Sequence, residues 1–515
     1  MSGTPAPGTP ATGTPALGSP VPKTLVPFDL RALRGTLDEA GRRPDGTSSL
    51  QPLDMSEVII GPGTVGRLGE VVGWLADGAG EVVILAAATP ITVRGTRLRD
   101  VVESQVASSY ALRWVVLGPA GGSVHADEQT VTAARKGAEG AGCVITVGSG
   151  TICDIGKAAA APGVPLVAVQ TATSVNGYAD PFSVLLKSGV KRTTPTRWPD
   201  ALIADTDVLV DAPDRLNLAG LGDMAAMFTA TADWYLAALL RADGPAYQPG
   251  VTDLVRPHGE AMLGLGGGLA ADPGRLADLA RLLTLSGIGM GVAGSTAPAS
   301  GMEHAVSHLL EMAATATEAA TCAATGGPST PGRGPSLHGE QVGVASIVAA
   351  ATWAHVRERV AQGGLGQGRG PARLPDPDVV GERISAAFGR LDPSGAMAAE
   401  CLADYAAKIR LLASAGDPLA TLREGWADCD AVLGRLLTSP AELATGLASA
   451  GLPVRFGDLP EPVDDDLAKW AVANCALQRR RFGVADLAML MGAWEDDDVA
   501  GVLAAAETAA DGATS

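Results

Sequence analysis

Two closely spaced histidines and two distant residues offer this chain a set of ligands for a divalent cation. His304 and His308 lie four residues apart in the run 300–308, so on a helix they share one face. A third histidine, His338, follows in the run 337–340, and Asp223 lies in the glycine-rich run 220–224. One carboxylate and two imidazoles suit a catalytic metal with an open coordination position. The alternatives are a histidine pair on the surface or in the core, and Asp223 as a helix N-cap after Gly222.

A glycine-rich turn offers a second kind of site, for phosphate groups. The strand Val144–Val147 runs into Gly148-Ser149-Gly150-Thr151, and a helix begins near Ile152. Backbone amides in such a turn approach phosphate oxygens, and the helix N-terminus favours their charge. The third glycine of the dinucleotide fingerprint is missing, so a plain tight turn is the alternative. The next strand, 166–170, ends in a polar loop, 171–178, at the carboxyl edge of the sheet, where ligands bind in such folds.

Alternating strands and helices over residues 56–207 predict the parallel α/β sheet that positions these groups. Apolar runs at 58–60, 81–86, 112–117 and 143–147 predict its first strands. From about Pro213 the strand signals disappear, which predicts a second, all-helical domain. We therefore expect a disordered Pro/Thr/Gly-rich extension (1–54), an α/β domain (55–210), a helical domain (211–505) and a small-residue tail (506–515).

Charge and composition narrow the classes of partner. The formal net charge is −18 over 515 residues, which disfavours nucleic acid or an anionic membrane as a partner. The six cysteines form no CxxC pair, and the first residues have neither the positive nor the apolar region of a signal peptide, so free thiols in a reducing cytoplasm are expected. No uninterrupted apolar run of about 18 residues predicts a membrane span.

Several of these motifs, in colinear order over roughly residues 55–500, resemble the sn-glycerol-1-phosphate dehydrogenases. That family belongs to the iron-containing alcohol dehydrogenase and dehydroquinate synthase superfamily. The matching runs are 148–157 (GSGTICDIGK), 171–178 (TATSVNGY), 203–207 (IADTD), 220–224 (GLGDM), 299–304 (ASGMEH), 337–343 (LHGEQVG) and 479–487 (RRRFGVADL).

The resemblance implies a Rossmann-like dinucleotide-binding domain, an all-α C-terminal domain, and an active site in the cleft between them. It implies that Asp223, His304 and His338 bind the metal, Zn²⁺ or alternatively Fe²⁺ or Ni²⁺, and that His308 faces the substrate. The implied reaction reduces dihydroxyacetone phosphate, a phosphorylated ketone, to sn-glycerol 1-phosphate with NADH or NADPH, in a homo-oligomer. Asp223 and His308 would act in catalysis, and Asn176 would join them at the substrate. The implied cofactor contacts are Gly148, Ser149, Gly150, Thr151, Ile152, Thr171, Ser174 and Asp180.

The chain also departs from the family pattern. Asn176 stands where an aspartate is usual, Asp180 where a serine is common, and Ala297 where an arginine is usual. The run 86–89 (AAAT) offers no acid for the adenosine ribose, so no preference for NAD over NADP is predicted. Lys191 and Arg192 are candidate phosphate partners, with a solvated basic turn as the alternative. The departures at Asn176, Asp180 and Ala297 motivate one alternative, a non-catalytic nucleotide-binding relative. The other alternative is a cyclase resembling dehydroquinate synthase, although the additional Lys and Asn phosphate contacts of such cyclases are not seen in this sequence.

Overall fold

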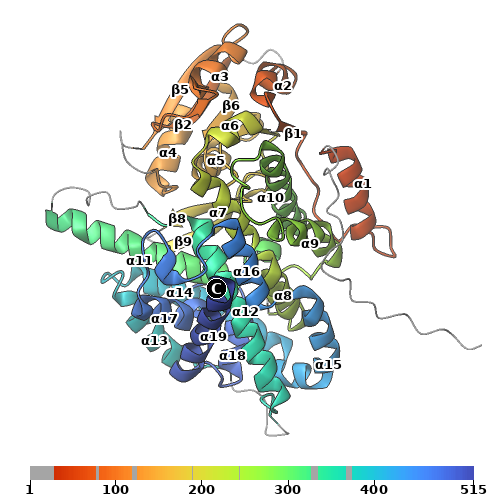
Figure 1. Ribbon diagram of the computed structural model, residues 1–515, viewed down its shortest axis with the longest axis vertical. Coiled ribbons are helices and arrows are strands. Elements are labelled where there is room, and N and C mark those ends of the chain that lie inside the picture. Colours follow the sequence, from red (N-terminus) through yellow and green to blue (C-terminus); the bar gives the residue numbers. More distant parts are fainter. Residues whose placement is uncertain are drawn as a thin grey trace, which may run out of the picture.

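A computed structural model of the protein describes residues 28–514, except 77–79, 119–123, 188–189, 243, 326–334 and 367–373. An α/β part and a helical part lie at opposite ends of the long axis (Figure 1). The change from strands to helices along the chain comes at Asp205, where the last strand ends and a helix begins at Thr206. This architecture confirms the predicted fold class.

The α/β part is built on one parallel sheet of six strands. In spatial order these are β1 (Glu57–Gly61), β10 (Ala201–Asp205), β7 (Leu166–Gln170), β6 (Ala141–Gly148), β2 (Glu81–Ala87) and β5 (Ala111–Leu117). The chain moves from β2 outward to β5 and then returns to β6 on the other side of β2. The order therefore reverses between β2 and β6, and a ligand crevice is expected at the carboxyl ends of these strands.

Helices on both faces cover this sheet, among them α2 (Leu68–Leu75), α3 (Leu98–Val106), α4 (Glu128–Gly137) and α5 (Gly150–Ala159). Their apolar faces form two separate clusters. One includes Leu68, Val102 and Ile84, and the other includes Val131, Ile155 and Leu85. Because Ile84 and Leu85 are consecutive on β2 but point to opposite faces, the sheet is buried on both sides.

Two short hairpins were not predicted from the sequence. The first pairs β3 (Thr92–Val93) with β4 (Thr96–Arg97) after β2. The second pairs β8 (Phe182–Lys187) with β9 (Val190–Pro195) in antiparallel register, with Leu186 opposite Lys191. In Figure 1 this second hairpin lies between the sheet and helix α11.

The rest of the described chain is helical. Its helices are α6 (Thr206–Asp211), α7 (Asp214–Met224), α8 (Met227–Leu239), α9 (Pro249–Leu263), α10 (Pro273–Ala293), α11 (Met302–Thr325), α12 (His338–Ala361), α13 (Pro377–Gly389), α14 (Ala396–Ala415), α15 (Pro418–Leu436), α16 (Pro440–Ala450), α17 (Asp465–Asn474), α18 (Val484–Leu490) and α19 (Asp496–Thr514). Helix α12 is central, because it packs against α7, α11, α16 and α19. It is buried along most of its length, including Trp353.

Both predicted terminal segments need correction. Part of the N-terminal extension is ordered, since Leu30–Gly41 forms helix α1, capped by the Asp29 side chain. Leu30, Leu33 and Leu37 bury one face of this helix, which packs against α9. The apolar spacing of these leucines outweighs the low-complexity texture around them. Residues 1–27 of the predicted extension lie outside the described residues. At the other end, α19 runs to Thr514, so the predicted tail is the last part of a packed helix.

One described helix, α10, is long and apolar enough to cross a membrane, but 83% of the relevant window is buried inside the protein. Leu276, Leu279 and Leu283 of α10 belong to the main hydrophobic core of the helical part. Helix α10 therefore serves as a core helix.

Candidate active site

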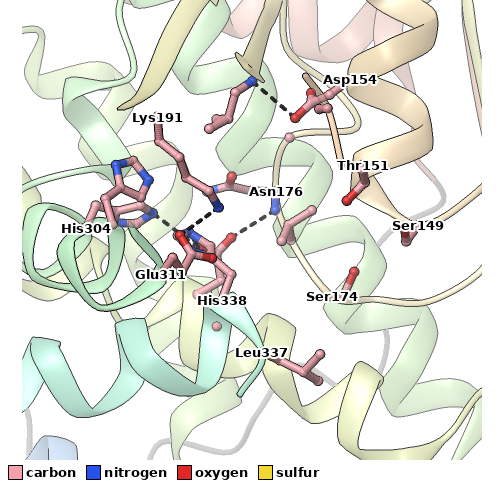
Figure 2. Close-up of a pocket in the computed structure, with 18 of the residues that line it drawn as sticks. Ser149, Thr151, Asp154, Ser174, Asn176, Lys191, His304, Glu311, Leu337 and His338 are labelled. Carbon is pink, nitrogen blue, oxygen red and sulfur yellow. Dashed lines mark hydrogen bonds and ion pairs between the residues drawn. The ribbon is translucent and has the colours of Figure 1, made fainter. Parts of the chain in front are cut away.

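A cavity of about 380 Å³ lies where the sheet meets the helical part. The β6–α5 turn, the loop after β7, hairpin β8–β9 and the first turns of α11 and α12 all contribute to its wall. Figure 2 shows Ser149 and Thr151 on one side of this cavity, and His304 and Glu311 on the other. The structure thus brings the glycine-rich β6–α5 turn (148–151), which we call the phosphate-type turn, and the proposed metal ligands to the same cavity.

Asp223, His304 and His338 converge in this cavity. The Oδ1 atom of Asp223 lies 3.3 Å from Nε2 of His304 and 3.8 Å from Nε2 of His338. One ligand atom from each residue lies within 4.8 Å of the others. Ligand atoms about 2.1 Å from a tetrahedral ion are themselves about 3.4 Å apart, so these separations suit one shared cation.

Three glycines allow close packing around helices α7 and α12, which carry Asp223 and His338. A Cβ on Gly339, next to His338, would lie 2.6 Å from the carbonyl carbon of Ala219 on α7. A Cβ on Gly222, next to Asp223, would lie 2.9 Å from the carbonyl carbon of Gly339. Gly220 meets the carbonyl of Thr173 in the same way. The glycine-rich runs found in the sequence therefore serve close helix packing, and Asp223 lies in the last turn of α7 rather than at an N-cap.

The carboxylate of Asp223 is left incompletely satisfied by the protein. Its Oδ2 accepts a hydrogen bond from the backbone N–H of Asn176 at 3.0 Å, but its buried Oδ1 has no hydrogen-bond partner. Burial opposes ionisation of Asp223, yet its interactions with His304 and His338 hold the pKa of this carboxyl below its usual value. A buried carboxylate oxygen without a donor, facing two imidazole nitrogens, is the environment that a cation would complete.

Further polar groups orient both imidazoles. Glu303 Oε1 lies 3.1 Å from Nδ1 of His304. Ser307 Oγ lies 3.2 Å from Nδ1 of His338, and Glu311 Oε1 lies 3.4 Å from the same atom. In each ring, Nδ1 thus contacts a polar side chain on the side away from Asp223, and Nε2 faces Asp223. Carboxylates behind metal-bound histidines commonly set the ring orientation in this way.

His308 lies beside the three ligands on the cavity wall. As the spacing predicts, it follows His304 by one turn of α11, and the two ring centroids lie 6.1 Å apart. Its ring stacks on that of His338 with centroids 5.6 Å apart. Burial lowers the pKa of His308 well below its usual value, so the ring is neutral near pH 7.

A second group of possible ligands overlaps the first. His308, Glu311 and His338 also place ligand atoms within 4.8 Å of one another. Glu311 already forms an ion pair with Lys191, whereas Oδ1 of Asp223 lacks a hydrogen-bond partner. Of the two groups, Asp223, His304 and His338 therefore offer the more suitable position for a cation. The sequence analysis missed Glu311, although it follows His308 by one helical turn.

The phosphate-type turn contributes some of its predicted residues to the cavity. Ser149, Gly150 and Thr151 line the cavity at the N-terminus of α5. The predicted cofactor residues Ser174 and Asp180 line it too, whereas Gly148, Ile152 and Thr171 are not among the described lining residues. Ile152 is buried with the apolar residues beneath the sheet, and a Cβ on Gly148 would lie 2.7 Å from its Cγ1. Gly148 therefore permits close packing at the turn.

Sequence comparison places the chain among known enzymes. The chain is 31% identical over 309 residues to the glycerol-1-phosphate dehydrogenase [NAD(P)+] of Halorubrum lacusprofundi, covering 56% of this chain and 75% of that protein. It is 30% identical over 319 residues to that of Hyperthermus butylicus, covering 60% of this chain and 82% of the relative. The chain belongs to the glycerol-1-phosphate dehydrogenase family. A match to the Bacillus licheniformis enzyme reaches 39% identity over 196 residues, but spans only 48% of that protein and 38% of this chain.

Two further comparisons concern the α/β part and the fold. The family description of iron-containing alcohol dehydrogenases matches residues 59–213, the α/β part and the turn into α7. A solved structure of a probable glycerol dehydrogenase from Sinorhizobium meliloti shares the fold, with a TM-score of 0.53 and 14% identity, covering 89% of this chain and 99% of that one. The glycerol-1-phosphate dehydrogenase family is a family of NAD(P)-dependent oxidoreductases, as the sequence motifs indicated.

The structure shows the contacts of Asn176 and Asp180, two residues that depart from the family pattern. The Asn176 amide donates to Ser286 Oγ at 3.2 Å, so its side chain is fixed on α10 at the cavity wall. Asp180 Oδ1 accepts from Lys157 Nζ at 2.8 Å, and its side chain is almost fully buried. Asp180 thus has a structural partner within the protein.

Lys157, which the sequence analysis did not single out, organises the loop that carries Asn176 and Asp180. Its Nζ donates to the carbonyl of Gly177 at 2.7 Å and to that of Phe182, and it pairs with Asp154 at 3.1 Å. Burial alone would lower the pKa of Lys157, but the carboxylates of Asp180 and Asp154 raise it above its usual value. The charged lysine therefore ties this loop to α5 and the start of β8.

Proposed function

We propose that this chain is a metal-dependent NAD(P)H oxidoreductase that reduces dihydroxyacetone phosphate, or a closely related phosphorylated ketone, to sn-glycerol 1-phosphate. The observation that carries the proposal is Oδ1 of Asp223, buried without a hydrogen bond and facing Nε2 of both His304 and His338. The names of the relatives support the substrate and the nucleotide. Zn²⁺ is the metal we expect, because a carboxylate and two imidazoles form an open catalytic zinc set; Fe²⁺ and Ni²⁺ are the alternatives.

The reaction adds a hydride to the carbonyl carbon and a proton to the carbonyl oxygen. The nicotinamide supplies the hydride, and the divalent ion, when bound, polarises the carbonyl. Asp223, His304 and His338 would hold the ion, with His338 and His304 oriented by Glu311 and Glu303. Their positions would fix the carbonyl of the substrate relative to the nucleotide.

His308 is placed to hydrogen-bond the substrate oxygen or to pass it the proton. It lines the cavity one turn along α11 from His304, and burial keeps its ring neutral. A neutral imidazole carries one N–H donor and one acceptor nitrogen, so it can deliver a proton and recover one. Asn176 would also contact the substrate, because its backbone N–H donates to Asp223 and so places this residue beside the metal ligands.

The nucleotide would bind along the β6–α5 turn. Ser149 and the first residues of α5, Gly150 and Thr151, line the cavity, and a helix N-terminus with adjacent hydroxyls suits the pyrophosphate. The sequence 86–89 at the end of β2 provides no acid for the ribose, so we expect both NADH and NADPH to be accepted. The five cysteines that the structure describes are free, which suits the reducing cytoplasm proposed as the location of this enzyme.

The test is a coupled set of assays on purified, zinc-reconstituted protein. NADH or NADPH oxidation should depend on dihydroxyacetone phosphate, stop with a chelator, and return with added zinc. Chiral analysis should identify the product as sn-glycerol 1-phosphate rather than its 3-phosphate enantiomer. Bound zinc without any net oxidation of either nucleotide would contradict the proposed reaction and favour the cyclase or the non-catalytic relative.

A further inference from the structure

One cation stands out on the wall of the active-site cavity. Among the lining residues that the structure describes, Lys191 is the single lysine or arginine. The other charged side chains there are acids: Asp154, Asp180, Asp223 and Glu311. A phosphate dianion entering this cavity of an acidic protein needs a local positive charge, and strong phosphate contacts are charge-assisted hydrogen bonds.

The hairpin β8–β9 explains why Lys191 faces the cavity. Side chains alternate between the two faces of a hairpin, and Val184, Leu186, Lys191 and Thr193 all line the cavity from one face. The neighbouring Arg192 points the other way. Its guanidinium pairs with Asp404 at 3.2 Å and donates to the carbonyl of Gln478 at 3.3 Å. Of the two consecutive basic residues on β9, Lys191 and Arg192, only Lys191 therefore lines the cavity.

Lys191 is positioned on the metal side of the cavity by an ion pair. Its Nζ lies 2.7 Å from Glu311 Oε2, one helical turn beyond His308 on α11. Figure 2 shows the Lys191 side chain reaching toward Glu311 on the side of His304 and His338, away from Ser149 and Thr151 of the nucleotide turn. The Lys191 side chain is 29% exposed and lines the cavity.

Glu311 also contacts His338, so Lys191 can leave Glu311 and bind a phosphate instead. The Oε1 atom of Glu311 lies 3.4 Å from Nδ1 of His338. If Lys191 turns toward an incoming dianion, Glu311 still faces the imidazole of His338. The partly buried Glu311 carboxylate is then not left without a partner, an outcome that would be costly.

We propose that Lys191 is the residue that recognises the phosphate of the substrate, and that Glu311 holds it in position beside the metal ligands. This inference rests on the proposed function, because it assumes a phosphorylated ketone. It makes Lys191 a determinant of specificity for phosphorylated over free ketones.

The test compares two ketones that differ only in the phosphate. Rates are measured for dihydroxyacetone phosphate and dihydroxyacetone with wild type, Lys191→Met and Lys191→Arg. Lys187→Met is the matched control, since Lys187 lies on the same hairpin, is exposed, and is not among the described cavity residues. Lys191→Met should lower kcat/KM for the phosphorylated ketone by about 10- to 100-fold, the effect of losing one hydrogen bond between charged groups. The value for dihydroxyacetone should stay within about twofold.

Lys191→Arg should recover much of the loss, because it keeps the charge, and Lys187→Met should match wild type. Equal losses with both ketones, or a change confined to the KM of the nucleotide, would overturn the inference. If wild type oxidises neither nucleotide with either ketone, the proposed reaction fails on its own. Calorimetric titration of dihydroxyacetone phosphate into wild type and Lys191→Met then decides about Lys191, and equal affinities would refute its role.

Discussion

The close contact of helices α7 and α12 predicts that a single added methyl group on Gly339 removes the metal. In Gly339→Ala the new Cβ would lie 2.6 Å from the carbonyl carbon of Ala219 and would overlap its oxygen. Carbon atoms pack best at about 3.5–4.0 Å, so the start of α12 must move away from α7 by about 1 Å. His338 is the neighbouring residue and moves with it.

The size of this shift decides the outcome at the metal. Nε2 of His338 now lies 3.8 Å from Oδ1 of Asp223. Two ligands about 2.1 Å from one ion cannot be more than about 4.2 Å apart. A shift of about 1 Å therefore takes His338 out of reach, and we expect zinc affinity to fall at least about 100-fold, the upper end of the range for perturbed outer contacts. Overpacking should also cost about 1–3 kcal/mol of unfolding free energy.

Gly343→Ala is the matched control on the same helix. A Cβ there meets its nearest atom, Cα of Gly222, at 3.3 Å, which a small adjustment relieves. Zinc affinity is measured by chelator competition and unfolding free energy by urea titration, with the fold of each variant checked by circular dichroism. A folded Gly339→Ala that binds zinc within about threefold of wild type, or a Gly343→Ala with the same loss, would refute the reasoning.

Three other predictions follow from the same structure. His304→Ala should lose bound zinc by elemental analysis, whereas His308→Ala should keep it and lose most ketone reduction; equal zinc loss in both would make His308 a ligand. Lys157→Met should lower the unfolding free energy by about 3–5 kcal/mol in urea titration, because it leaves the buried Asp180 and the partly buried Asp154 without their shared cation, and an unchanged midpoint would contradict this. Burial raises the pKa of five thiols to about 11 or 12, so these thiols remain protonated and unreactive to iodoacetamide at pH 8. Unfolding in urea should return their pKa to about 8.5 and make them reactive. Fast labelling of the native protein at these sites would contradict their burial. These thiols are Cys143, Cys153, Cys401, Cys429 and Cys475.

The central strands and the histidine helix were predictable because their signals are local. The apolar runs that became β2, β6 and β7 are buried on both sides of the sheet, so each reads as a continuous apolar segment. The spacing of His304 and His308 is likewise a property of one helix, and the structure places them one turn apart on α11.

The remaining parts depend on contacts between distant segments. Nothing local marks Lys157 as the partner of Asp180, or Glu311 as the partner of Lys191, because each pair joins different elements. Hairpin β8–β9 mixes polar and apolar residues, and its strands are only partly buried, so its residues gave no clear strand signal. Helix α1 was not predicted because the surrounding Pro- and Gly-rich sequence indicates disorder, although the leucines of α1 follow helical spacing.

The most direct test of this account is an anomalous diffraction map recorded at the zinc edge from crystals of the reconstituted enzyme. We predict one peak within coordination distance of Oδ1 of Asp223 and Nε2 of both His304 and His338. A map with no peak there, or with its peak between His308 and Glu311, would contradict the proposed metal site.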